Sequence, residues 1–284
     1  MRIAVVGAAG QLGAAVVAEC SPGHDVIRLT RAELDFTNDA AVADVIGRAA
    51  PDAIVNCAAF NNVDLAEERP MDALSVNAFA VRALAREAER CGAALVHYGS
   101  DFVFDGTASV PYTEADHPSP LSVYGASKML GEWFAVDPPR GYALRVESLF
   151  GRAPGGPQPK GSVASIFNGL LSGSSPKVFS DRTVSPTYII DAARATREIL
   201  ERRPEPGLYH CVNSGHCTWL EFARELAKQA GVEANVTPVR TADVTLRARR
   251  PQFCALSNEK LRRAGIEMPS WQDAIARYVR GVRL

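Results

Sequence analysis

Two side chains that can move a proton, Tyr124 and Lys128, lie four residues apart in the segment YGASK (124–128). Residues i and i+4 of a helix face the same way, so a helix here presents both side chains together. A free tyrosine has a pKa of about 10, and a general acid works best with a pKa near the operating pH. Because a neighbouring ammonium favours the tyrosinate, we expect Lys128 to lower the pKa of Tyr124. The alternative is a surface tyrosine over an aliphatic lysine stem.

A glycine-rich segment near the N-terminus, GAAGQLG (7–13), has a spacing typical of dinucleotide binding. Gly7 and Gly10 let the backbone turn tightly and approach a pyrophosphate, and Gly13 lets a helix pack on the preceding strand. Gln11 and Leu12 open that helix, whose free N–H groups and positive dipole end face the phosphates. The segment therefore predicts a bound dinucleotide cofactor. A plain strand–helix turn is the alternative.

The residues after the second predicted strand bear on which cofactor is bound. An acidic residue at this point usually holds the ribose 2′-OH of NAD, whereas an arginine accommodates the 2′-phosphate of NADP. This chain has Thr30 and Arg31 there, with Glu33 and Asp35 further on. The pattern favours NADPH and leaves NADH open, because Arg31 can also be a solvated loop residue.

The elements that must position these residues alternate along the first half of the chain. Apolar runs predict strands over residues 3–8, 25–29, 53–59, 94–100 and 142–150. Amphipathic stretches predict helices over residues 11–20, 39–49, 71–92 and 122–135, with Asn38 as a cap and Gly92 as a helix end. Apolar strands alternating with helices indicate a parallel sheet covered on both faces. With right-handed connections, this is an α/β protein with a Rossmann-type doubly wound fold.

The pattern changes after Gly151, which suggests two interleaved domains. Residues 1–151 are predicted to form a dinucleotide-binding Rossmann domain, and segments near 185–213 return to it. The Pro- and Gly-rich stretch 152–161 predicts an exposed loop. Helical segments such as 218–231 then dominate. Residues 152–284 are therefore predicted to form mainly a smaller, largely helical substrate-binding domain.

Composition excludes several function classes. The net charge of −1 provides no field that would attract nucleic acid or anionic lipid. The longest apolar runs are interrupted within about ten residues, too short for a membrane span. Glycines break the first apolar run early, so we interpret it as a strand rather than a signal peptide and expect a cytoplasmic protein. The six cysteines and five histidines are dispersed, so neither disulfides nor a metal centre are expected. A homodimer is left open.

Several segments, taken in order, resemble a known family. They are GAAGQLG (7–13), NCAAFNNVDLAEE (56–68), Asn77, HYGSDFVFDG (97–106), VYGASK-x-x-GE (123–132) and SPTYIID (185–191). Together they resemble the extended short-chain dehydrogenase/reductase superfamily and, more narrowly, the dTDP-4-dehydrorhamnose reductase family. The segment ARRPQFCALSNEKL (248–261) is similar to that family's Arg-Pro signature. The resemblance implies NADPH-dependent reduction of a nucleotide-linked 4-keto-6-deoxy sugar, most closely dTDP-4-dehydrorhamnose to dTDP-rhamnose.

The resemblance also implies roles for individual residues. Ser100, Tyr124 and Lys128 match the catalytic set. Hydride passes to the C4 carbonyl carbon, Tyr124 protonates the oxygen, Ser100 hydrogen-bonds it, and Lys128 also holds the nicotinamide ribose. The remaining cofactor positions are Asp35 and Phe36 beside the adenine, Ala58 and Ala59 at the end of a strand, and Asn77 near the catalytic loop. The two alanines can equally be plain strand packing, and Asn77 a local hydrogen-bonder.

The implied substrate-binding residues are Ser100, Asp101, Phe102, Tyr124 and Arg250. Asp101 can instead cap the turn after Ser100. Arg250 suits the substrate diphosphate because a guanidinium binds phosphate oxygens bidentately, although Arg247, Arg249 and Arg250 can also form a solvated face.

The chain departs from the family at several places, including Ser100 where a threonine is usual and Asn61 and Asn62 where smaller or hydroxyl residues are usual. Phe102 stands where a tyrosine is usual, and residues 145–151 read RVESLFG where the family tends to carry Arg-Thr-x-Trp-Val-Tyr-Gly, so Glu147 is unexpected. The departures leave the identity of the nucleotide sugar less certain than the chemistry. Two alternative functions also stay open, a nucleotide-sugar epimerase of the same superfamily and a non-catalytic NADP-binding regulatory subunit. A dehydratase needs an acidic pair beside the Ser/Thr position, which Asp101 followed by Phe102 does not supply.

Overall fold

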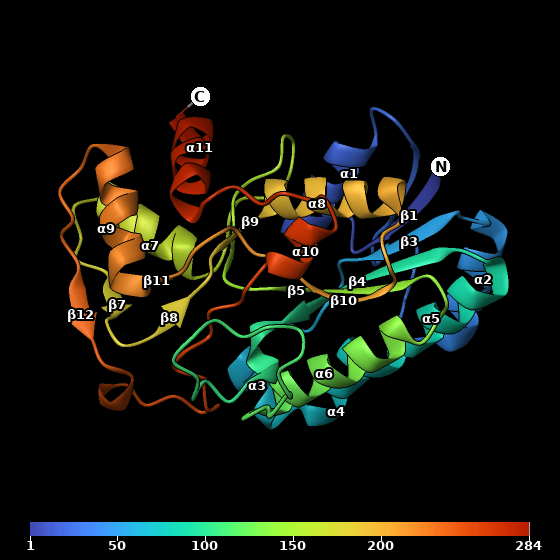
Figure 1. Ribbon diagram of the computed structural model, residues 1–284, viewed down its shortest axis with the longest axis horizontal. Coiled ribbons are helices and arrows are strands. Elements are labelled where there is room, and N and C mark those ends of the chain that lie inside the picture. Colours follow the sequence, from blue (N-terminus) through green and yellow to red (C-terminus); the bar gives the residue numbers. More distant parts are fainter. Residues whose placement is uncertain (284) are drawn as a thin grey trace.

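A six-stranded parallel sheet forms the centre of the computed structural model, which describes residues 1–283 (Figure 1). The strand order is β10-β5-β4-β3-β1-β2, and every neighbouring pair runs parallel. The strands are β1 (Arg2–Val6), β2 (Asp25–Leu29), β3 (Ala53–Asn56), β4 (Ala94–Ser100), β5 (Gly141–Val146) and β10 (Gly207–His210). The chain reverses its direction of travel across the sheet between β1 and β3. This confirms the predicted Rossmann-type doubly wound fold, in which ligands bind beyond the carboxyl ends of the strands at such a switch point.

Helices cover both faces of this sheet (Figure 1). One face carries α1 (Gln11–Cys20), α8 (Ile189–Arg202) and the short α10 (Glu259–Arg263). The other carries α2 (Asp39–Ala49), α5 (Ala80–Cys91) and α6 (Val123–Val136), with the short α3 (Val63–Glu68) and α4 (Pro70–Leu74) at one end. Successive residues of a strand point to opposite faces, so β1 contributes Ile3 and Val5 to one core and Ala4 and Val6 to the other.

A third core lies beside the sheet, toward the C-terminus (Figure 1). It is built by α7 (Ser162–Leu171), α9 (Trp219–Ala230) and α11 (Trp271–Arg283). Three two-stranded pairs accompany it: β6 (Leu149–Phe150) with β9 (Thr187–Tyr188), β7 (Lys177–Phe179) with β12 (Thr237–Val239), and β8 (Thr183–Val184) with β11 (Cys217–Thr218). Phe150, Phe222 and Tyr278 meet at its centre in edge-to-face contacts.

Local sequence signals placed several elements at their observed bounds. The predicted strands 25–29 and 94–100 and helices 11–20 and 39–49 coincide with β2, β4, α1 and α2. Asn38 caps α2 by accepting hydrogen bonds from the N–H groups of Ala40 and Ala41. Gly92 ends α5 in the left-handed conformation, with φ of 66°.

The prediction of one strand over residues 142–150 is wrong. β5 ends at Val146 in the main sheet, and β6 begins at Leu149 and pairs with β9 instead. Ser148 between them has φ of 45°, which turns the chain out of the sheet. The predicted strands 3–8 and 53–59 are also too long, since β1 ends at Val6 and β3 at Asn56. Both continue into loops that line the site described below.

The predicted single helix over residues 71–92 is helical throughout but not uniform. Between α4 and α5, residues Ser75–Phe79 form a π-helical segment, a feature frequent at functional sites. It holds Asn77, whose side chain is fully buried and bonds the backbone N–H and C=O of Phe60 and the hydroxyl of Ser127. These bonds tie the loop after β3 to α6.

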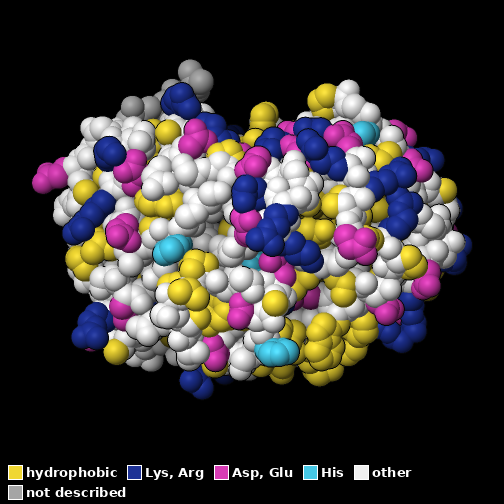
Figure 2. Space-filling model, viewed as in Figure 1, with side chains coloured by type: hydrophobic (Ala, Val, Ile, Leu, Met, Phe, Trp, Pro, Cys, Tyr) yellow, Lys and Arg dark blue, Asp and Glu magenta, His cyan; other side chains and the backbone are white. Residues whose placement is uncertain are grey.

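The exterior is mixed in charge. On the face drawn in Figure 2, Lys and Arg side chains are interspersed with Asp and Glu. Within residues 1–283, no helix has both the length and the apolar character that crossing a membrane would require. All six cysteines are free thiols, and four of them are buried, as the dispersed spacing predicted.

Candidate active site

A cavity of about 640 Å³ lies at the carboxyl ends of the sheet strands. The main sheet and its helices form one wall, and the segment that leads into α7, together with Trp219 at the start of α9, forms the opposite wall. The predicted site residues that line it are Gly10, Gln11, Leu12, Ala58, Ala59, Ser100, Asp101, Phe102, Tyr124, Lys128 and Arg250. Residues that are far apart in sequence therefore converge on one space.

The glycine loop fits a bound dinucleotide. Gly7 has φ of 78°, and a Cβ on Gly13 would lie 2.2 Å from the Gly7 carbonyl oxygen, so the helix can approach the strand only without a side chain there. Gly10 precedes α1, and no side chain of the described residues caps this helix end. The free N–H groups at this helix end can therefore donate hydrogen bonds to phosphate oxygens. Gly7 and Gly13 shape the loop from behind without lining the cavity.

Gln11 joins this loop to the exposed stretch 152–161. Its Nε2 donates to the carbonyl oxygen of Gly151 at 3.1 Å, and its Oε1 accepts from the backbone N–H of Lys160 at 3.1 Å. Both amide groups are therefore used to hold the loop against the start of α1. Lys160 also lines the cavity, although the sequence offered no signal for it beyond its charge.

The residues after β2 lie outside the cavity lining. Glu33 bonds the N–H and hydroxyl of Thr30, and these hydrogen bonds lower the pKa of Glu33. Arg31 is exposed. Asp35 caps its own turn through Thr37, and Phe36 is buried in the core beneath α2. Arg31 is thus a cation at the expected strand end, and the adenine-side roles of Asp35 and Phe36 remain predictions.

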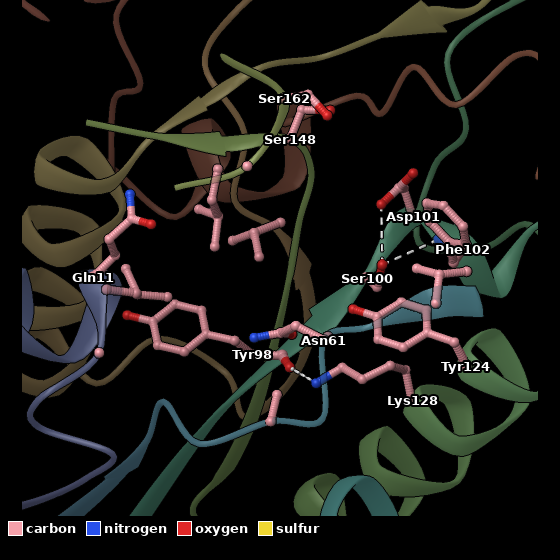
Figure 3. Close-up of a pocket in the computed structure, with 18 of the residues that line it drawn as sticks. Gln11, Asn61, Tyr98, Ser100, Asp101, Phe102, Tyr124, Lys128, Ser148 and Ser162 are labelled. Carbon is pink, nitrogen blue, oxygen red and sulfur yellow. Dashed lines mark hydrogen bonds between the residues drawn. The ribbon is translucent and has the colours of Figure 1, made fainter. Parts of the chain in front are cut away.

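Ser100, Tyr124 and Lys128 meet at the end of β4 (Figure 3). The Tyr124 hydroxyl points toward Ser100, and Lys128 extends from the next turn of α6. A Cβ on Gly125 would lie 2.2 Å from the carbonyl oxygen of Phe102, so α6 can sit this close to the β4 end only with glycine there. The Phe102 ring packs edge-on against Tyr124, with ring centroids 5.4 Å apart.

Burial shifts the pKa values of Tyr124 and Lys128. The expectation that Lys128 lowers the pKa of Tyr124 is wrong for this structure: burial, with a smaller contribution from Asp101, raises the pKa of Tyr124 above its ordinary value. Burial lowers the pKa of Lys128 to about 8, against the opposing effect of Glu132. Lys128 Nζ donates to the Tyr98 carbonyl oxygen at 2.5 Å. Tyr124 is therefore protonated near neutral pH, and Lys128 keeps two further donors.

A buried ion pair supports the end of β4 from behind. Glu132 of α6 accepts from Arg145 of β5 at 2.8 Å (Nη2) and 3.0 Å (Nε), and their side chains are 5% and 3% exposed. Glu132 Oε1 also lies 3.3 Å from the backbone nitrogen of Ser100 and accepts its hydrogen bond. The pair thus joins α6, β5 and the residue that carries the Ser100 hydroxyl. The sequence showed Glu132 only as part of a motif.

Of the three arginines Arg247, Arg249 and Arg250, one borders the cavity. The Arg250 guanidinium binds the Asp64 carboxylate in a bidentate contact, at 3.0 and 2.7 Å, and it borders the cavity. Arg247 pairs with Glu68 and is exposed, as is Arg249. Only Arg250 of the three therefore faces the cavity, and it does so already paired with a carboxylate.

A second set of polar side chains at the cavity was not predicted as a group. Arg182 lines the cavity and is 8% exposed. Asp101 does not cap the turn after Ser100, because Ser100 itself accepts from the Phe102 N–H. Asp101 lines the cavity, and its carboxyl group lies beside Glu147 and Cys254. In the sequence Glu147 is only a departure from the family pattern, and nothing there indicates that its side chain lies beside Asp101.

The family model described as "RmlD substrate binding domain" matches residues 1–284. This chain belongs to the RmlD family. The dTDP-4-dehydrorhamnose reductase of Burkholderia thailandensis, a relative, is 35% identical over 297 residues, covering 99% of this chain and 98% of that protein. These findings confirm the predicted resemblance.

Solved structures of RmlD relatives have the same fold over their full length. The crystal structure of a dTDP-4-dehydrorhamnose reductase from Clostridium acetobutylicum is 31% identical, with a TM-score of 0.92 and coverage of 100% of both chains. The same enzyme from Bacillus anthracis, crystallised in complex with NADP, is also 31% identical, with a TM-score of 0.92 and coverage of 99% of each chain.

Proposed function

We propose that this RmlD-family chain reduces a nucleotide-linked 4-keto-6-deoxy sugar with NADPH, and that the substrate is dTDP-4-dehydrorhamnose, which becomes dTDP-rhamnose. The observation that carries the proposal is the meeting of Ser100, Tyr124 and Lys128 in one cavity with the glycine loop. It is supported by relatives named dTDP-4-dehydrorhamnose reductase and by one such structure that contains NADP. Bound NADPH would supply the hydride.

The residues of the chain would hold the cofactor at two points. The start of α1, at Gly10, Gln11 and Leu12, offers N–H groups to the diphosphate. Lys128 offers the two donors not used by Tyr98 to the nicotinamide ribose. Ala58 and Ala59, small residues on the cavity wall after β3, leave room between these points. Arg31 would meet the 2′-phosphate that distinguishes NADPH from NADH.

Tyr124 would act as the general acid. Burial keeps its hydroxyl protonated near neutral pH, so it has a proton to donate to the carbonyl oxygen. Ser100, whose hydroxyl donates to Asp101 in this structure, would turn that hydrogen bond to the same oxygen and orient it, an interaction that stabilises the developing charge. Phe102 holds the Tyr124 ring in place by edge-on packing.

The opposite wall would hold the nucleotide sugar. Arg250 and Arg182 border the cavity and can bind the substrate diphosphate, Arg250 while it stays paired with Asp64. Trp219 also lines the cavity on this wall. This arrangement supports the proposed division of the chain into a cofactor domain of residues 1–151, joined by segments near 185–213, and a substrate domain of residues 152–284.

The test is NADPH oxidation by the purified chain with dTDP-4-dehydrorhamnose, beside other nucleotide-linked 4-keto sugars and with NADH as the alternative cofactor. We expect oxidation of NADPH, formation of dTDP-rhamnose, and a lower Michaelis constant for NADPH than for NADH. Tight NADPH binding without oxidation by any 4-keto sugar would indicate a regulatory binding protein instead. Conversion of a nucleotide sugar without net NADPH consumption would indicate an epimerase.

A further inference from the structure

Two carboxyl groups that the proposed mechanism leaves unused meet behind Ser100. Asp101 follows β4, Glu147 follows β5, and Cys254 lies on the loop before α10. One carboxylate oxygen of each acid and the Cys254 sulfur all lie within 4.8 Å of one another. Asp101 is 4% exposed and Glu147 2% exposed, so both acids are inside the protein.

The hydrogen bonds and charges around Asp101 and Glu147 are too few to stabilise both side chains as carboxylates. Asp101 Oδ1 accepts from the Ser100 hydroxyl at 3.0 Å, and Glu147 Oε2 accepts from the Ser185 N–H at 2.6 Å. Glu147 Oε1 is buried and has no hydrogen-bond partner within residues 1–283. Arg182 faces the group but donates to the Pro251 carbonyl oxygen and, at 3.9 Å, to the Cys254 sulfur. Among the described residues, no ion pair joins it to either acid.

This arrangement favours one proton shared by two carboxyl groups. Two buried carboxylates this close repel each other, and a single arginine outside ion-pair distance offsets only part of their charge. Burial and the charge of Asp101 raise the pKa of Glu147 well above its ordinary value, and burial raises the pKa of Asp101 to about 6. The other titratable or charged groups that face the pair are Arg182, Tyr124, Cys217 and Cys254.

The tyrosine and cysteine side chains around the pair add no negative charge near neutral pH. Burial raises the pKa of Tyr124, Cys217 and Cys254, so these three groups are neutral. A proton held on Glu147 can occupy its Oε1, a buried oxygen that lacks a partner among residues 1–283, and point at Asp101.

We propose that Asp101 and Glu147 share one proton near neutral pH and return it through the Ser100 hydroxyl to Tyr124 after each reduction. Glu147 is thus a positioning residue, which acts through Asp101 and Ser100. This proposal rests on the proposed function, because a reduction consumes one proton in each turnover.

Each step moves one proton between oxygen atoms. Tyr124 gives its proton to the oxygen of the reduced carbonyl and becomes a phenolate. The Ser100 hydroxyl gives its proton to Tyr124, and the single shared proton passes from Glu147 to Asp101 and on to the Ser100 oxygen. The pair is then doubly negative and regains a proton from solvent through the cavity, which Asp101 lines. Only O–H bonds break and form, and no oxidant or reductant is needed.

Infrared spectroscopy of the ligand-free chain tests proton sharing independently of activity. We expect a carboxylic-acid band of a protonated, buried carboxyl group at neutral pH in the native chain and its loss in Glu147→Gln. Glu114→Gln is the matched control, since Glu114 is a partly buried acid that also accepts a backbone N–H, from His210. The control is expected to keep the band. Absence of the band from the native chain, or a metal ion bound at the pair, overturns the proposal.

Steady-state kinetics test the return of the proton. In Glu147→Gln we expect kcat to fall roughly ten- to a hundredfold above neutral pH with both Michaelis constants within about twofold, because a proton route is lost but binding is not. The rate should recover as the pH falls through about 6, where Asp101 itself gains a proton. Glu147→Asp, which keeps an acid, should restore much of kcat.

The outcomes separate the two proposals. A native chain that reduces the sugar while Glu147→Gln shows the same kcat and pH profile overturns the proton route and leaves the proposed function intact. A native chain that reduces no 4-keto sugar overturns the proposed function, and the infrared band still decides whether the pair shares a proton. If Glu147→Gln fails to bind NADPH or loses its native circular dichroism, the proposal is tested instead by the kcat and pH profile of Glu147→Asp and by the carboxylic-acid band of the native chain.

Discussion

Removing the carboxylate of Glu132 should destabilise the protein more than any change to its surface ion pairs. In Glu132→Gln the side chain keeps its shape, but Arg145 stays charged and buried without a counter-ion. The groups left around that guanidinium include His210, at 3.4 Å, and the Phe104 ring, at 4.9 Å, and the charge of Arg145 also reaches the partly buried Glu114. Burial lowers the pKa of His210 to about 3, so the imidazole is neutral and does not repel Arg145.

The magnitude follows from the burial and the contacts. Breaking a buried ion pair by removing one partner costs about 3–5 kcal/mol of unfolding free energy. The glutamine oxygen can still accept from Arg145 Nε and from the Ser100 N–H, so we expect the lower end, about 3 kcal/mol. That is a large share of the roughly 5–15 kcal/mol that holds a typical domain folded.

Urea unfolding followed by circular dichroism measures this cost, and a surface pair supplies the control. Asp44 and Arg48 form an ion pair with side chains 62% and 73% exposed, one turn apart on α2. Asp44→Asn should cost no more than about 0.5 kcal/mol. The double variant Glu132→Leu with Arg145→Met should be much closer to the native chain than Glu132→Gln is, because neither charge stays buried.

Two results would refute this reasoning. A cost below about 1 kcal/mol for Glu132→Gln would mean that water reaches Arg145 and screens it as at a surface. A double variant less stable than the single one would mean that the pair contributes favourable energy of its own beyond compensating two buried charges.

Three further predictions concern the site. Tyr124→Phe should bind NADPH with near-native affinity, by fluorescence titration, and lower kcat by about 10³–10⁴-fold, since the general acid is lost; unchanged turnover would remove Tyr124 from the mechanism. Ser100→Ala should lower kcat less, by about 10²-fold, because Tyr124 remains as the acid; a loss as large as that of Tyr124→Phe would contradict this ranking. In the free chain the pKa of Lys128 is lowered to about 8, so its ammonium is present below that pH and lost above it. The rate constant kcat/KM should therefore fall as the pH rises through about 8, and a profile level to about pH 10 would be the contrary outcome.

Much of the fold was predictable because its signals are local. Asn38 and Gly92 mark helix ends through their own backbone and side-chain chemistry, which does not depend on the rest of the chain. The alternation of apolar strands and amphipathic helices allows few arrangements besides a doubly wound sheet. Where tertiary contacts override local pattern, prediction failed: the run 142–150 breaks at Ser148 because the second half pairs with β9 instead of the main sheet.

The site also has features that local spacing predicts and features that depend on the tertiary structure. The spacing of Tyr124 and Lys128 determines that they share a helix face, and the glycine spacing determines the shape of the loop before α1. The pKa of Tyr124 could not be read from that spacing, because its direction depends on burial, which other elements impose.

Sequence alone therefore determined the residue types at the ends of the strands, and only the tertiary structure decided which of them meet. Arg250 pairs with Asp64 across 186 positions, and Glu147 reaches Asp101 from the next strand of the sheet. Both are contacts between side chains from elements distant along the chain. Their distances, and the low dielectric that makes two carboxyl groups compete for one proton, exist only once the sheet and its covering helices have formed.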